Sequence, residues 1–483
     1  MSPDTLAHIR GNRQPADPAG PTGQLATWLA DFRLEDVPAT TRQRALHLLL
    51  DGVGCALVGA QLPWSRRAAE SVCRLEGTGP ALLIGWNRSL PAPAAALLNS
   101  TFIQGFELDD FHPFAPLHSA SLVLPALLAT AQMRGPVSGA EFLKAAIAGF
   151  EVGPRVGLAL HGIEMLSRGW HSGAVFGTHA AAAAAGSVLR LDAAQFEDAL
   201  GVAGTQSSGL MAAQFGAMSK RMHHGFAARS GVYAAWLAAD GYTGIKRVFE
   251  EKYGGYLAAF GEGHDPDASQ VSKDLGRHWE TDRIVVKLHA AMGGLQSPVD
   301  AVLAVKKERP FRPEEIERID VWVGTAVFHH GAFAIQRPLT SVGAQMSLAY
   351  TVSVACVDGA AMAQQYAADR INSDEVWRLV PKVHMHLDES FQGSPRMKLR
   401  CRLRIGFTDG TTRELEQSLR FSEDVSNDEI AAKFRLLCEP VVSSERCRRI
   451  EETVLGLEQS ADIGTLLALL SEEVRPIFGT NAE

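Results

Sequence analysis

Ionisable side chains gather in one short segment of the chain, residues 107–118, which reads ELDDFHPFAPLH. Three carboxylates and two imidazoles lie there, directly before the apolar run 120–129. Folding would hold these groups at the edge of a hydrophobic core, where charge is costly unless it is paired or used. A histidine among carboxylates can exchange protons near neutral pH. The segment is therefore the first candidate for a functional site.

Three interpretations of this segment are open. Glu107, Asp109, Asp110, His112 and His118 could ligate a metal ion through oxygen and nitrogen atoms, although no second cluster completes a pattern such as HExxH. The two aspartates could instead cap a helix while His118 bonds to the backbone. His118, oriented by a carboxylate, could also act in acid/base catalysis, and the rest of the chain favours this third interpretation.

His171 is a second candidate, because it follows Gly-Trp and precedes Ser-Gly at an expected helix start. Helix N-termini favour negative ligands, so an imidazole there can contact an anion or carry a proton. A single histidine is more often structural, so this residue gains weight only in company with the others.

Cationic groups occur in two further places. Lys220 and Arg221, with two histidines close behind, follow the loop 204–216, which is rich in small polar residues. Free N–H groups of that loop, together with Lys220, could bind carboxylates, whereas the alternative is a solvated helix face. Lys287 ends an apolar strand and precedes the loop sequence HAAMGG. Cations, imidazoles and one acidic cluster together indicate a small polycarboxylate and proton transfer.

Helices are expected to carry most of these residues, because apolar side chains recur at helical spacing through the first half of the chain. A helix from 40 would open with the capping-box spacing Thr40-x-x-Gln43. Small residues at 169–191, with six alanines at 180–185, predict a buried helix that a neighbour approaches closely. Further helices are expected at 24–32, 91–97, 142–153, 194–203 and 226–241, with turns at 135–136 and 153–154.

Alternation of apolar and polar residues then predicts strands at 316–323 and 397–407, with a hairpin turn at 408–411. Helical spacing separates them and returns from 427 to 470. The fold class is therefore mainly α with a smaller α+β domain. We expect a disordered tail at 1–20, a helical domain at 21–270 that 427–483 completes, and the α+β domain at 271–426.

Net charge, apolar runs and the lack of known motifs argue against several classes of function. The net charge of −8 gives no electrostatic reason to expect nucleic acid as a partner, and no apolar run reaches membrane-spanning length. No GxGxxG, P-loop or nucleophile-elbow sequence is present, so neither a nucleotide cofactor nor a serine hydrolase is indicated. The six cysteines are scattered without a CxxC pair, which suits reduced thiols in the cytoplasm.

Several segments, in this order along the chain, resemble the MmgE/PrpD family. They are 50–65 (LDGVGCALVGAQLPWS), 102–110 (FIQGFELDD), 116–121 (PLHSAS), 169–175 (GWHSGAV), and 220–229 with its KR and HGFAAR sequences. The resemblance covers nearly the whole chain after residue 20. Within the family, the segments are most similar to fungal cis-aconitate decarboxylases.

The resemblance implies a large helical domain with an α+β lid, a homodimer, and a site between the domains that uses neither cofactor nor metal. It implies decarboxylation of cis-aconitate to itaconate, with dehydration of 2-methylcitrate as the alternative activity and a non-catalytic tricarboxylate-binding protein as a third possibility. The implied catalytic residues are Glu107, His118, His171, Lys220 and Lys287, and the implied substrate-binding residues are Asp109, Arg221 and Gln296.

Two positions depart from the family pattern. Glu107 stands where many relatives have Asp. Gln296 stands where relatives usually carry His, which leaves the identity of the substrate open.

Overall fold

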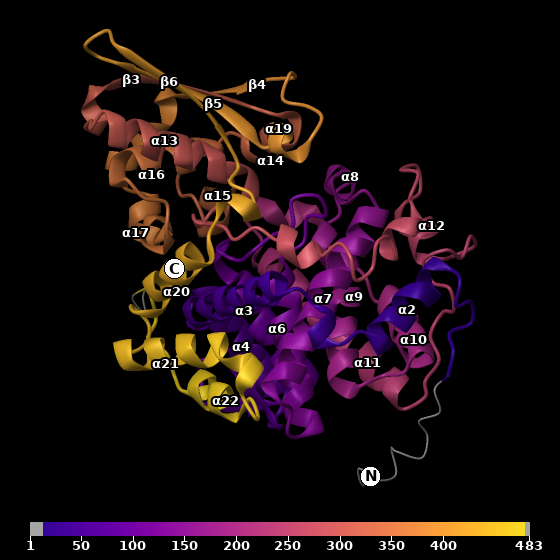
Figure 1. Cartoon of the computed structure of the whole chain (residues 1–483). Coiled ribbons are helices and arrows are strands. Elements are labelled where there is room, and N and C mark those ends of the chain that lie inside the picture. Colours follow the sequence, from indigo (N-terminus) through magenta and orange to yellow (C-terminus); the bar gives the residue numbers. More distant parts are fainter. Residues whose placement is uncertain (1–12, 479–483) are drawn as a thin grey trace.

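The computed structural model describes residues 13–478 and shows a helical part with a smaller mixed part over one side of it (Figure 1). The chain is mainly α with a smaller α+β domain, as predicted. The helical part contains α2 (Pro21–Asp31), α3 (Ala39–Gly59), α4 (Pro63–Glu76), α5 (Ala92–Ile103), α6 (Ser119–Arg134), α7 (Gly139–Ala159), α8 (Gly162–Ser167), α9 (Ser172–Leu189), α10 (Ala193–Gly204), α11 (His223–Ala239) and α12 (Tyr256–Phe260).

The end of the chain returns to this helical part. Its elements are α20 (Asn427–Cys438), α21 (Ser444–Leu455) and α22 (Gly464–Ser471), and α20 packs against α3. A short hairpin of β1 (Ala81–Leu83) and β2 (Arg88–Leu90) also belongs here.

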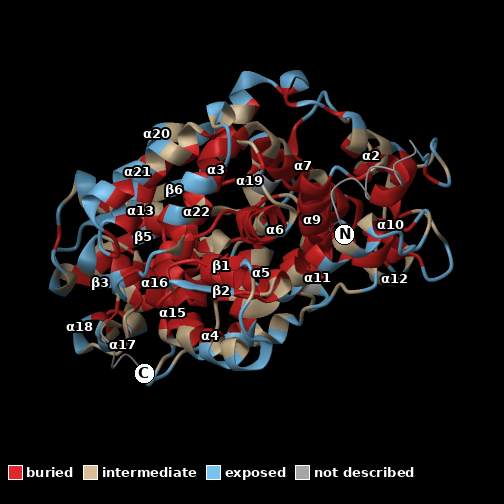
Figure 2. Cartoon of the chain, turned by 90° about the horizontal axis from the view of Figure 1, so that it is seen from below, coloured by how far each residue is buried: buried red, intermediate tan, exposed pale blue. Residues whose placement is uncertain are grey.

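Small residues let the central helices approach closely, as the alanine run predicts. A Cβ atom added to Gly153 of α7 would lie 2.9 Å from the Cβ of Ala180 on α9, and one added to Gly149 would lie 3.1 Å from that of Ala184. Figure 2 shows α6 and α9 as buried elements at the centre of this part. The close contact of α7 with α9 therefore depends on glycine and alanine.

Two local predictions are wrong. Thr40 does not open a capping box, because α3 already begins at Ala39 after Pro38 and no side chain caps it. Pro154 does not end a helix but lies inside α7, which starts with a true capping box between Ser138 and Glu141. A proline inside a helix costs a backbone hydrogen bond, and here the packing of α7 on α9 offsets that cost.

The smaller part is built on a four-stranded sheet of order β4-β3-β5-β6. β3 runs parallel to β4 and antiparallel to β5, and β5 and β6 form the hairpin predicted at 408–411. The parallel strand β4 was not predicted from the sequence. The bounds of the strands are β3 (Ile316–Val323), β4 (Val383–Leu387), β5 (Arg400–Phe407) and β6 (Thr412–Ser418).

Helices pack on one face of this sheet, between it and the helical part (Figure 1). α13 packs against β5 and β6, and α16 packs against β4. The helices of the smaller part are α13 (Gln296–Glu308), α14 (Thr325–Gly331), α15 (Ser341–Met346), α16 (Leu348–Asp358), α17 (Ala368–Ile371), α18 (Asp374–Trp377) and α19 (Pro395–Lys398).

The predicted disordered tail needs a correction at 13–20. The backbone carbonyl of Arg13 accepts a hydrogen bond from Ala194, and the backbone N–H of Ala16 donates to Glu197, both on α10. Residues 1–12 of the predicted tail lie outside the described residues.

Among residues 13–478, no single helix is both long and apolar enough to cross a membrane. α3 and α4 together pass on length and composition, but they are bent by 86°.

Candidate active site

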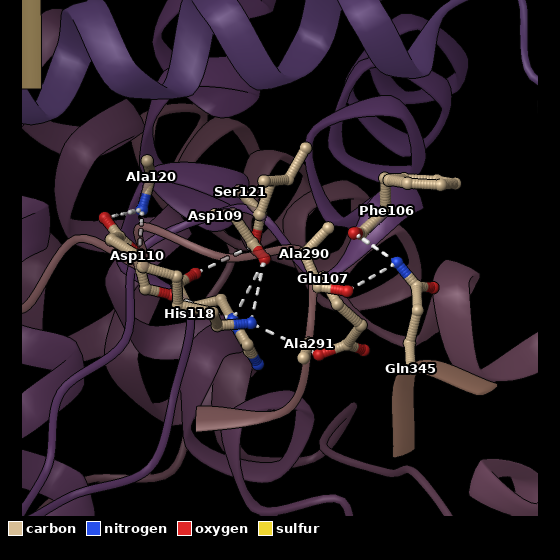
Figure 3. Close-up of polar contacts among 12 residues, drawn as sticks. Phe106, Glu107, Asp109, Asp110, His118, Ala120, Ser121, Ala290, Ala291 and Gln345 are labelled. Atoms are coloured by element: carbon tan, nitrogen blue, oxygen red, sulfur yellow. Dashed lines mark hydrogen bonds and ion pairs between the residues drawn. The ribbon is translucent and has the colours of Figure 1, made fainter. Parts of the chain in front are cut away.

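The acidic segment forms a loop between α5 and α6 that several long-range contacts hold. Glu107 has the left-handed φ of 55°, which is uncommon for a residue with a side chain. On either side of it, Phe106 O accepts a hydrogen bond from Gln345, and Leu108 O accepts one from Lys433 of α20. Figure 3 shows Gln345 reaching both Phe106 and Ala290. Tertiary contacts therefore stabilise this backbone conformation and turn the carboxylate of Glu107 towards two lysines.

Glu107 is the centre of a buried cluster of charges. Its carboxylate pairs with Lys220 and lies 3.2 Å from Nζ of Lys287, which is also 3.5 Å from Asp109. Burial acts to raise the pKa of Glu107, but the two ammonium groups outweigh burial and hold it well below its usual range. Asp109 likewise keeps a lowered pKa, because His118 and Lys287 outweigh its burial. Both carboxylates are therefore ionised at neutral pH.

His118 lies at the N-cap of α6 and is held through one ring nitrogen (Figure 3). Nδ1 lies 2.8 Å from the backbone carbonyl of Asp110 and 3.2 Å from the carboxylate of Asp109. Because Nδ1 is engaged, Nε2 is the nitrogen that can exchange a proton with a bound molecule.

Asp110 has a structural role at the same place, since its carboxyl accepts a hydrogen bond from Ala120 at the start of α6. Burial and the nearby Asp109 raise the pKa of Asp110 well above its usual value. The interpretation of the segment as a helix start is therefore correct for this residue, and it coexists with a histidine oriented by a carboxylate.

Three further histidines form a chain of contacts that begins at His118, from His224 to His171 to His223, and burial favours their neutral form. Nδ1 of His171 lies 2.9 Å from Nδ1 of His223, and the ring of His171 stacks on His224 at 5.1 Å. Burial, reinforced by Lys220, lowers the pKa of His223 to about 4. Burial also lowers the pKa values of His171 and His224 well below the usual range. His223 and His224, the two histidines that follow Lys220 and Arg221 in the sequence, therefore add no positive charge to them at neutral pH.

The five residues predicted to be catalytic all line one cavity of about 150 Å³, which we call the inner cavity. They come from distant parts of the chain: Glu107, His118, His171, Lys220 and Lys287. Its opposite wall comes from the smaller part and includes Lys398 of α19 and His330 of α14. Sequence reasoning missed these two residues, because no pattern distinguishes their segments.

The three residues predicted to bind substrate do not line the inner cavity. Asp109 is fully buried behind His118 and Lys287. Arg221 donates to the carbonyl of Gly105 and stacks on Trp64. Both residues support the lining and do not form it.

Gln296 is anchored in the backbone that follows Lys287. Its amide accepts hydrogen bonds from Leu288 and His289 and donates to the carbonyls of His289 and Ala291. These bonds fix the loop after the lysine, so a direct contact with substrate is not indicated.

The small-residue loop also differs from its expected role. Among the residues of 204–216 whose side chains the structure describes, Met211 alone lines the inner cavity. Backbone N–H groups that the prediction left for carboxylates are used within the fold: Met211 donates to Gly169, and Ala213 donates to Leu210. The loop therefore supplies an apolar side chain.

Lys433 could have been found from the sequence. It lies between Ile430 and Phe434 on the buried face of α20, and a lysine on an apolar helix face signals a buried partner.

Within the described part of the chain, no group of three or more His, Cys, Asp or Glu side chains is arranged to hold a metal ion. The metal interpretation of the acidic segment therefore gains no support from the geometry.

Comparison with known proteins identifies the family of this chain. Sequence models of the MmgE/PrpD N-terminal domain and the MmgE/PrpD C-terminal domain match residues 23–269 and 289–459. The chain belongs to the MmgE/PrpD family. It is a lyase of that family.

Relatives with assigned names cover almost the entire chain. The cis-aconitate decarboxylase-like protein oryM of Aspergillus oryzae is 44% identical over 94% of this chain and 98% of its own length. The cis-aconitate decarboxylase of Aspergillus terreus is 39% identical over 95% of this chain and 97% of its own. The human cis-aconitate decarboxylase is 25% identical over 95% of this chain and 96% of its own.

Proposed function

We propose that this carboxy-lyase decarboxylates cis-aconitate to itaconate in the inner cavity. The observation that carries the proposal is the convergence of two lysines, two histidines and one carboxylate on one enclosed space. Relatives named cis-aconitate decarboxylase, at 39% identity over nearly the full chain, support the same reaction.

The lysines supply the charge that this substrate requires. Cis-aconitate carries three carboxylates, and Lys220 and Lys287 are buried cations at one end of the cavity. Glu107 and Asp109 offset the charge of the two lysines, but Asp109 lies behind the cavity lining, so the ammonium groups that face the cavity still attract a bound anion locally. Charge-assisted hydrogen bonds from the ammonium groups would fix the two carboxylates that the product keeps.

The reaction then needs a group that accepts the electron pair and a group that donates one proton. Breaking the bond between the CH2 carbon and its carboxylate releases CO2 and leaves an allylic carbanion, which the conjugated carboxylate absorbs as a dienolate. Cations beside that carboxylate stabilise the charge as it develops. Nε2 of His118 delivers the proton to the far carbon, which completes itaconate, and solvent restores the proton afterwards.

Product analysis by NMR tests the proposal. The purified protein is incubated with cis-aconitate and, separately, with 2-methylcitrate. We expect CO2 and itaconate from the first acid. Loss of water from 2-methylcitrate without decarboxylation of cis-aconitate would contradict the proposal, and binding without turnover of either acid would do so as well.

The role of His118 is tested by replacing it. We expect His118→Ala to lower kcat by about 10²- to 10⁴-fold, the usual contribution of general acid catalysis. His278→Ala is the control, because this histidine is 52% exposed and lies outside the inner cavity. Near wild-type turnover by His118→Ala would refute the assignment of the proton donor.

We also propose that the protein is a homodimer. Phe226, Tyr233 and Leu237 follow each other at helical spacing on α11, and their side chains are exposed. Large apolar side chains along one helix face are typical of a subunit interface. A second copy of the chain is the partner that the family resemblance implies.

A further inference from the structure

The inner cavity has a charged end and an apolar end. A wider cavity of about 790 Å³, which we call the outer cavity, shares part of its lining with the inner cavity. The shared apolar residues are Ile163, Leu166, Met211 and Ala326, and they lie beside His330 and Lys398. None of the five proposed catalytic residues lines the outer cavity. The apolar passage therefore leads away from the charge cluster and opens between α8 and α14.

The apolar passage extends beyond the space that cis-aconitate itself needs. The two carboxylates that the product keeps require the lysines at the charged end, whereas the third leaves as neutral CO2 and needs no cation afterwards. The carbon that loses CO2 is thus the part of the substrate best suited to the apolar side. Its substituent would point into the passage, where Ile163, Leu166 and Met211 stabilise apolar surface.

We infer that the preferred substrate is a cis-aconitate with an unbranched alkyl chain on the carbon that loses CO2. The inference rests on the proposed function and narrows its substrate class. The same bond breaks as in cis-aconitate, CO2 leaves, and the electron pair moves through the allylic system to the far carbon, which takes one proton. The product is an itaconate whose methylene carbon carries the alkyl chain, held between Leu166 on α8 and Ala326 on α14.

Competition between two synthetic acids tests the inference. Each methylene buried in the passage is expected to raise kcat/KM roughly fourfold, and a butyl chain by about two orders of magnitude over unsubstituted cis-aconitate. Ala326→Leu narrows the passage and is expected to reduce this ratio at least tenfold. Ala332→Leu is the matched control, since this half-buried alanine follows α14 and lines neither cavity.

The possible outcomes separate the two proposals. Equal or lower kcat/KM for the butyl acid overturns the substrate class and leaves decarboxylation of cis-aconitate intact. Decarboxylation of neither acid overturns the proposed function and the inference with it. If Ala326→Leu does not fold, Leu166→Phe narrows the passage from the helical part, and an unchanged ratio in the folded variant overturns the inference.

Discussion

A buried ion pair between the first and last parts of the helical domain is expected to stabilise both the fold and the active-site loop. Nζ of Lys433 on α20 lies 2.7 Å from Asp51 on α3, with side chains 3% and 0% exposed. The same ammonium group donates to Leu108 O, one residue after Glu107. Lys433→Met keeps most of the side-chain volume and removes both interactions.

The magnitude follows from the burial of the pair. Removing one partner of a buried ion pair costs about 3–5 kcal/mol, because the other charge is left without compensation. Burial raises the pKa of Asp51, and Lys433 is the main group that opposes this effect; within the described residues neither carboxylate oxygen has any other hydrogen-bond partner. Unfolding entropy near 2.1 cal/mol/K per residue gives about 1 kcal/mol/K for 483 residues, so Tm should fall by roughly 3–5 °C.

Calorimetry of the single variants and of Asp51→Asn/Lys433→Met measures this coupling. We expect the double variant to lose less stability than the sum of the losses of the two single variants, because neither charge is then left without a partner. Turnover should remain impaired in it, because Leu108 O still lacks its donor. A Tm within about 1 °C of wild type for Lys433→Met, or purely additive losses, would refute the reasoning.

Three further outcomes are expected. Glu107→Gln should lower kcat by about 10²-fold through misplacement of its two lysines, without raising KM, because it removes negative charge beside the substrate; steady-state kinetics that show a raised KM and unchanged kcat would contradict this. His224 has a pKa well below its usual 6.5, through burial and the nearby His118, so the unfolded state binds more protons. The free energy of unfolding should therefore fall as pH drops from about 7 to 5. Urea titrations at several pH values should show that this free energy depends less steeply on pH in His224→Gln than in the wild type. Tyr233→Lys with Leu237→Lys should convert the proposed dimer into monomers in light scattering, and a monomeric wild type would refute the dimer.

The sequence by itself was sufficient for the fold class and for the five catalytic candidates, but not for Lys398 and His330 of the same cavity. Apolar spacing of 3.6 and of 2 residues distinguishes helices from strands locally, and small residues on α9 require a close neighbour wherever it comes from. Charged residues beside an apolar run must be paired or used, and this rule singles out Glu107, His118 and Lys287 from the sequence alone.

Only the tertiary structure decided which candidates face the inner cavity. Arg221 and Gln296 have the residue types of ligand contacts, but the fold uses their polar atoms for backbone groups. Arg221 donates to Gly105, 116 residues away, and Gln296 bonds to the loop between Leu288 and Ala291. The neutral state of His224 likewise depends on burial by several helices, which no local spacing encodes. Hydrogen-bond partners and desolvation depend on contacts that only the folded chain makes, so the tertiary structure decides the roles of polar residues. The helices and strands follow from local apolar spacing, which the sequence contains.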